Sequence, residues 1–142
     1  MPLFAGNSRD DLRAIWREAW RKHRERLPLA PLEAQLVDLI RAHPEYHAEL
    51  EQDTGGNSQP SGTSPYLHLG LHAAVREGLA TDRPAGIRAA YEAVLATCPT
   101  AHDAEHVLLE CLGETLWDAQ RAGRPPDETA YLECVRRRVM TR

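Results

Sequence analysis

The feature of this sequence with the most chemical content is a repeated histidine spacing. Six of the seven histidines form three pairs in which the partners are four residues apart: His43 and His47, His68 and His72, and His102 and His106. Seven histidines placed at random in such a chain would give only about a third of one such pair. On an α-helix this spacing puts both imidazoles on one face, where both can bind the same metal ion. The pairs therefore predict a metal site.

The third pair belongs to a longer polar stripe. In the stretch "AHDAEHVLLECLGE", Glu110 and Glu114 follow His102 and His106 at further steps of four. Two imidazoles and one carboxylate suit iron, zinc or manganese. Glu114 either bridges a second ion or faces solvent, and Glu105, three residues after His102, is an alternative ligand of the kind used in di-iron bundles.

The predicted metal ligands come from all three pairs and the two glutamates: His43, His47, His68, His72, His102, His106, Glu110 and Glu114. The predicted ion is iron first, with zinc or manganese as alternatives. Outer candidates are Glu33 and Glu77, and possible partners of the ligands are Arg76 and Arg121. Packing in the core remains the alternative for His68 and His72, and a helix-end role is the alternative for His43, which precedes Pro44. The kink expected at Pro44 also weakens the case for His47 facing the same way as His43. His23, beside two tryptophans, is expected to pack in the core.

Helices are the elements that must position these side chains. Apolar residues recur at steps of three and four, and no segment alternates with period two. The sequence predicts helices starting after Ser8, at Pro31, Pro65 and Ile87, after Thr100 and at Pro126, with an extra turn or two in "PEYHAEL". The expected fold is an all-α bundle of five or six helices. We expect one domain over 1–142, with a flexible loop at 53–64 that is rich in Gly, Ser and Pro.

Composition excludes several classes of function. The net charge is −4 at pH 7, which provides no basic field for nucleic acid. No apolar run approaches the roughly 20 residues of a membrane span, and the first residues, "MPLFAGNSRDD", lack the basic and apolar pattern by which a secretory signal is predicted. Three cysteines without regular spacing, Cys98, Cys111 and Cys134, suggest reduced thiols in the cytoplasm. Cys111 is expected to be a small core residue, with a ligand or nucleophile as the alternative.

A resemblance covers nearly the whole chain. It rests on "IWREAWRKHRERLPLAPLEA", "HPEYHAEL", "PYLHLGLHAAVREGL", "GIRAAYE", "AEHVLLECLGETLWDAQRAGRPPDE" and "YLECVRRR". In these stretches the chain resembles a small bacterial family known as a domain of unknown function, number 1841. The resemblance implies that the quoted His, Glu and aromatic positions belong to the family pattern, and it implies no activity. One departure is Ser64, where an Asn is expected before the proline, and serine also caps helices well.

Two functions of different classes follow. The first is a metal-binding helical bundle, haemerythrin-like by analogy of architecture, with a redox, oxygen, metal-handling or hydrolytic role. The second is a non-catalytic protein-interaction module without metal. In that module the histidines form a hydrogen-bonded core, and exposed aromatics such as Trp117, Tyr131 or Tyr66 meet a partner. A homodimer or another protein partner is left open.

Overall fold

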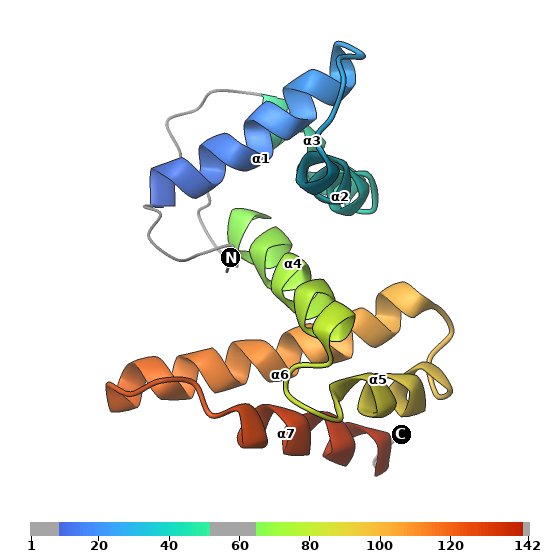
Figure 1. Cartoon of the computed structure of the whole chain (residues 1–142), viewed down its shortest axis with the longest axis vertical. Helices are drawn as coiled ribbons and strands as arrows, with labels where there is room; N and C mark the ends of the chain where they lie inside the picture. Colours follow the sequence, from blue (N-terminus) through green and yellow to red (C-terminus); the bar gives the residue numbers. More distant parts are fainter. Residues whose placement is uncertain (1–8, 52–64, 141–142) are drawn as a thin grey trace. The chain divides into compact units, whose positions relative to one another are not determined.

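The computed structural model describes residues 9–51 and 65–140, and within them every regular element is a helix (Figure 1). The helices are α1 (Arg9–Arg24), α2 (Pro31–Arg41), the 3-10 turn η1 (Pro44–Tyr46), α3 (His47–Glu51), α4 (Pro65–Thr81), α5 (Ile87–Leu95), α6 (Ala101–Ala122) and α7 (Glu128–Met140). The all-α prediction is confirmed. The described part has seven α-helices, slightly more than predicted, because the turns after Pro44 form a helix of their own.

The chain divides into two compact units, Met1–Ala73 and Ala74–Arg142. Helix α4 contributes its first half to the first unit and its second half to the other. That the whole chain acts as one domain stays a prediction, and the predicted loop at 53–64 lies outside the described residues. Among the described helices, none combines the length and the apolar composition that a bilayer span requires.

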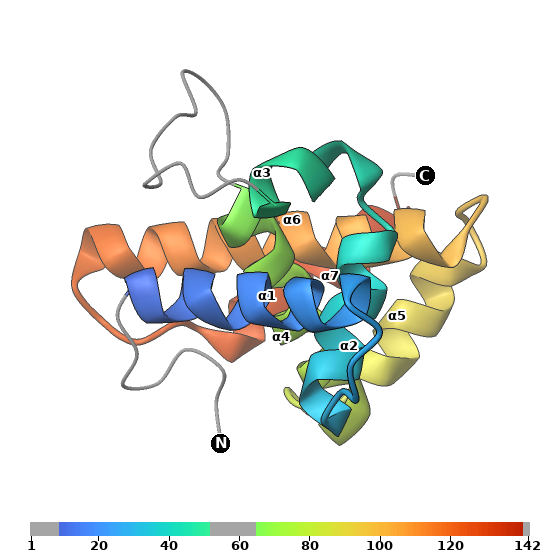
Figure 2. The same ribbon diagram turned by 90° about the horizontal axis from the view of Figure 1, so that it is seen from above.

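The first unit is built around two tryptophans of α1. Trp16 is 1% exposed and Trp20 is 6% exposed, and both pack against the buried face of α2. Figure 2 shows α1 beside α2 and α3, with which it is in contact. The buried apolar residues of this core are Trp16, Ala19, Trp20, Leu36, Val37, Leu39, Ile40, Leu50 and Leu69. The start of α2 is fixed by Pro31 and by the Ala30 N–H, which donates to Glu33 Oε1 at 2.9 Å.

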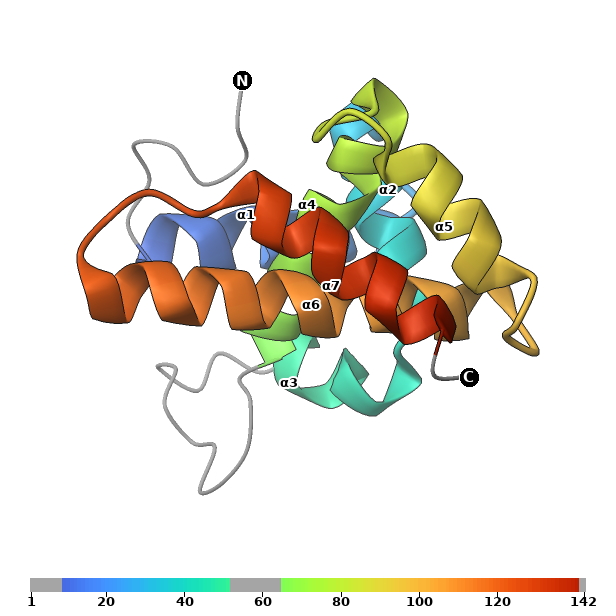
Figure 3. The same cartoon turned by 90° about the horizontal axis from the view of Figure 1, so that it is seen from below.

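The second unit packs α5 and α7 against α6, the longest helix described (Figure 3). Thr100 caps α6, because its hydroxyl accepts the Asp103 N–H at 3.1 Å. Gly123 ends the helix with a φ of 67°, a conformation that favours glycine. Leu108 from α6 and Val135 from α7 are fully buried. The packing of these apolar faces fixes the orientation of α6 against α7, and therefore the positions from which the polar side chains of α6 project.

Asp82 organises the turn between α4 and α5. Its carboxylate accepts the Arg88 N–H at 3.0 Å and the Gly86 N–H at 3.3 Å. These backbone hydrogen bonds stabilise the charged carboxylate, so they hold the pKa of Asp82 below its ordinary value. Asp82 itself has a φ of 53°, which aspartate and asparagine tolerate better than most residues.

This lowered pKa makes the contribution of Asp82 to stability depend on pH. A carboxyl group whose pKa is lower in the folded state stabilises the protein above its unfolded pKa, and that stability is lost as the pH falls through the folded pKa. We therefore expect Asp82→Asn, which keeps an acceptor oxygen, to lower the Tm at pH 7. The Tm difference from wild type should shrink below about pH 4. Thermal melts followed by circular dichroism from neutral to acid pH measure it, and a difference independent of pH would contradict the assignment.

Candidate metal centre

Three of the predicted histidines meet in the first unit. His43 follows the end of α2, and His68 and His72 lie one turn apart on the first half of α4. Each offers a ring nitrogen that lies within 4.8 Å of the nitrogens of the others. The ring centroids are 4.9 Å apart for His43 and His68, 4.7 Å for His43 and His72, and 4.9 Å for His68 and His72. We call His43, His68 and His72 the histidine cluster.

Hydrogen bonds fix the orientation and the tautomer of the His43 ring. Its Nδ1 lies 2.8 Å from the backbone carbonyl oxygen of Leu39. A carbonyl only accepts, so Nδ1 carries the hydrogen and donates it. In a neutral ring, Nε2 then carries the lone pair, and it lies 3.2 Å from Nε2 of His68. His68 donates across this contact, and the lone pair of His43 is directed toward the cluster. A carbonyl that orients an imidazole in this way is common behind metal-binding histidines.

The cluster is shielded from water. His43 is 1% exposed and His72 is 0% exposed, while His68 is half-buried. Tyr46 stacks on His43, with ring centroids 5.5 Å apart and an angle of 10° between the planes. Burial of the Tyr46 hydroxyl raises its pKa above the ordinary value for tyrosine. Polar rings gathered in such surroundings need compensating partners, and a metal ion or mutual hydrogen bonds both supply them.

His47 lies away from the cluster, although it is four residues from His43. Its Nε2 donates to the backbone carbonyl oxygen of Ile40 at 2.8 Å. Its ring packs on Trp20, with centroids 4.5 Å apart. The separation arises at Pro44: His43 has φ −128° and ψ 69°, outside the helical region, so the two histidines do not share one helix face. His23 also stacks on Trp20, with centroids 5.2 Å apart, in agreement with its expected packing role.

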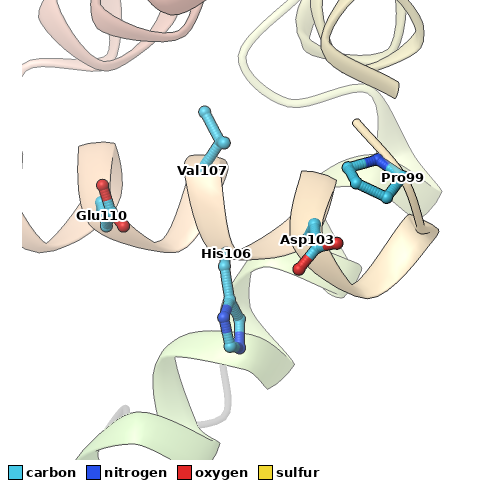
Figure 4. A pocket seen from close by; sticks show the side chains of 5 residues that line it. All are labelled: Pro99, Asp103, His106, Val107 and Glu110. Atoms are coloured by element: carbon cyan, nitrogen blue, oxygen red, sulfur yellow. The ribbon is translucent and has the colours of Figure 1, made fainter. Parts of the chain in front are cut away.

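The third histidine pair lies on α6 in the second unit. The rings of His102 and His106 have centroids 4.3 Å apart. Figure 4 shows His106 in a pocket of about 420 Å³ lined also by Pro99, Asp103, Val107 and Glu110. That this pair joins the other two in one ligand set stays a prediction.

The acidic candidates of α6 have other partners. Glu110 accepts a hydrogen bond from Arg138 of α7 at 2.8 Å. Glu114 lies 3.8 Å from the same guanidinium, and its Oε2 is 3.3 Å from Sγ of Cys134. Glu105 accepts a hydrogen bond from Arg76 at 3.0 Å. The structure therefore gives each of these carboxylates a cationic partner.

The outer candidates are also placed. Glu33 binds Lys22 at 2.9 Å, and the Ala30 backbone N–H and Lys22 together lower the pKa of its carboxyl group. Glu77 is exposed on α4, and Arg121 lies 3.8 Å from Asp118 on the surface of α6. The Lys22–Glu33 ion pair joins α1 to α2, whereas the Arg121–Asp118 pair lies within α6.

The cysteines differ from expectation. Cys111 and Cys134 form a disulfide between α6 and α7, with their Cα atoms 5.7 Å apart, so the prediction of reduced thiols is wrong for this pair. Cys98 is a free thiol. The sequence reasoning also missed Tyr46, whose place beside His43 follows from the turn that Pro44 begins. The spacing of Cys111 and Cys134 puts each cysteine on the inward side of its predicted helix. This inward placement is the feature of the sequence that could have indicated their pairing.

Comparisons with known proteins add one finding. A family model described only as a domain of unknown function matches residues 8–137 of the chain. Among curated proteins and among solved structures, none matches the chain.

Proposed function

The chain belongs to this family, DUF1841, and because the family description gives no activity, we propose from the histidine cluster that the protein binds a divalent metal ion. The observation that carries the proposal is the convergence of His43, His68 and His72 on one buried point. Three imidazoles from one unit are enough to hold an ion with one coordination position left open.

The spacing of the nitrogens supports this proposal. In a tetrahedral zinc site with Zn–N bonds of about 2.0–2.1 Å, two ligand nitrogens lie about 3.3 Å apart. The Nε2 atoms of His43 and His68 are 3.2 Å apart. An ion would replace the hydrogen that these two nitrogens share. The metal-free and the metal-bound arrangements would therefore differ by only a small adjustment of the two rings. His72, within 4.8 Å of both, completes the set with a modest side-chain movement.

The ligand type favours zinc over the iron that the sequence put first. A set of neutral imidazoles suits zinc, copper, nickel and iron, whereas the iron prediction relied on a carboxylate beside two histidines. Glu110 and Glu114 lie against Arg138 in the second unit instead. Three histidines and one water form the arrangement in which zinc lowers the pKa of the bound water to about 7. We propose metal handling or metal-assisted hydrolysis at this position.

The predicted ligands on α6 stay candidates for a second ion. His102 and His106 have the close ring contact that two ligands of one ion need. Glu110 or Glu114 would have to leave Arg138 to join them. Binding at this pair is therefore expected to be weaker than at the histidine cluster.

Elemental analysis of untagged protein tests the proposal. We expect about one metal ion per chain at the histidine cluster, which is zinc, or iron where iron is supplied without oxygen. After removal of metal by a chelator, calorimetric titration with Zn²⁺, Fe²⁺ and Mn²⁺ should show the tightest binding for Zn²⁺. Absence of binding by all three ions to folded protein would overturn the proposal.

That negative result would favour the interaction module. The hydrogen bond between His43 and His68 is also what a metal-free polar core requires. Of the aromatics expected to meet a partner, Trp117 is 61% exposed, whereas Tyr131 is buried and Tyr66 is half-buried. Only Trp117 has the accessibility that this role demands.

A further inference from the structure

A second group of ligating side chains lies between α6 and α7, apart from the histidine cluster. Its members are Cys111 and Glu114 from α6 and Cys134 from α7. Their sulfur and carboxylate oxygen atoms all lie within 4.8 Å of one another. We propose that the reduced form of this group is a thiolate metal site, and that formation of the disulfide closes it.

Helix geometry explains why the three side chains meet. Cys111 and Glu114 are three residues apart on α6, so they lie on neighbouring turns of one face. Cys134 reaches the same face from α7, which packs along α6 (Figure 3). Its Sγ lies 3.3 Å from Glu114 Oε2. In the dithiol form, the thiol of Cys134 donates to this carboxylate.

Two thiolates and a carboxylate form a ligand set for zinc or a similar thiophilic divalent ion. With Zn–S bonds of about 2.3 Å, the sulfurs of a tetrahedral site lie about 3.8 Å apart, so reduction must let them separate. The Cα atoms, 5.7 Å apart, allow this through side-chain rotation. Solvent or another ligand would fill the fourth position.

Access to the group is through Glu114. The cysteines are buried, Cys111 at 0% and Cys134 at 6% exposed. The side chain of Glu114 is 63% exposed, so its carboxylate can meet an ion in solution and carry it to the sulfurs. Arg138, 3.8 Å from Glu114 and 2.8 Å from Glu110, holds the carboxylate near the cysteines when no ion is bound.

The redox chemistry balances with a dithiol as the reductant and a disulfide as the oxidant. A dithiol reductant supplies two electrons and two protons, the S–S bond breaks, and the reductant becomes a cyclic disulfide. The two cysteine thiols then each lose a proton to solvent as their sulfurs bind M²⁺. Oxidation by a disulfide reverses the exchange: the incoming disulfide takes two electrons from the thiolates and two protons from solvent and becomes two thiols, the S–S bond between Cys111 and Cys134 forms again, and the ion is released.

Cobalt titration of the full chain tests the site, because sulfur ligation of Co²⁺ gives a charge-transfer absorption that histidine ligation does not. The protein is reduced with dithiothreitol, desalted without oxygen and titrated in a His68→Ala background. We expect one equivalent of Co²⁺ with the thiolate absorption after reduction and none in the oxidised protein. Failure here leaves the proposed function of the histidine cluster untouched, since that function rests on His43, His68 and His72 and uses neither cysteine.

Matched variants locate the ligands. Cys134→Ser should abolish the thiolate absorption, and Glu114→Gln should weaken Co²⁺ binding at least ~10-fold. Cys98→Ser, which changes the free cysteine, should leave both unchanged. Absorption that persists in Cys134→Ser or disappears in Cys98→Ser would overturn the proposal. Loss of the helical circular dichroism on reduction would overturn it as well, because the site requires α6 and α7 to remain packed.

Discussion

Replacing Trp16 by alanine is expected to lower the free energy of unfolding by about 3–5 kcal/mol. Trp16 is 1% exposed and lies in the core that α1 forms with α2. Removing its indole deletes a large apolar surface and leaves a cavity that the surrounding residues, among them Leu36 and Ile40, fill only in part. Denaturant unfolding followed by circular dichroism measures the change.

Trp117→Ala is the matched control for this result. It removes the same side chain from a position that is 61% exposed on α6. Its cost should stay within about 0.5 kcal/mol, as for most surface substitutions. Equal losses for the two tryptophans would contradict the core described for the first unit. Trp16→Phe, which keeps an aromatic ring, should show an intermediate loss and remain folded.

The second large effect concerns metal affinity. His68→Ala is expected to lower the affinity for Zn²⁺ by more than ~100-fold, since even residues that only support a ligand contribute 10- to 100-fold. His68 is the half-buried member of the histidine cluster, so its removal leaves a smaller cavity than loss of His43 or His72 would. Competition with a chromophoric chelator at neutral pH measures the affinity.

His47→Ala is the control that separates ligation from packing. His47 is also an imidazole from the predicted pairs, but it donates to Ile40 and packs on Trp20. We expect its removal to affect thermal stability while the Zn²⁺ affinity stays near that of wild type. If His47→Ala and His68→Ala lose affinity equally, the ion is not held by the histidine cluster. Far-UV circular dichroism of each variant confirms that the helices are retained.

The sequence predicts the helices well because their apolar spacing is local. Trp16, Ala19 and Trp20 recur at steps of three and one on α1, and all three are buried. Proline and threonine also mark helix starts locally, as Thr100 does for α6. Within α4, a step of four is enough to bring His68 and His72 together, because the helix is regular there.

The partners of these side chains are harder to predict, because they come from other helices. Nothing in the spacing of Glu110 indicates Arg138, which is 28 residues away on α7. The pairing of Cys111 with Cys134 likewise requires the packing of α6 on α7. The spacing of four residues between His43 and His47 does not place the two side chains on one helix face, and the reason is local. Pro44 ends the helical conformation at His43.

The disulfide between α6 and α7 has a consequence for the unfolded chain. Its cysteines are 23 residues apart, and they enclose the end of α6, the turn at Gly123 and the start of α7. In the chain-entropy model, closing a loop of this length removes conformational freedom worth about 3 kcal/mol from the unfolded state at 25 °C. The oxidised and reduced chains therefore differ in stability even where their folded contacts are the same. Part of the free energy of unfolding of the second unit thus comes from the lower conformational entropy of its unfolded chain.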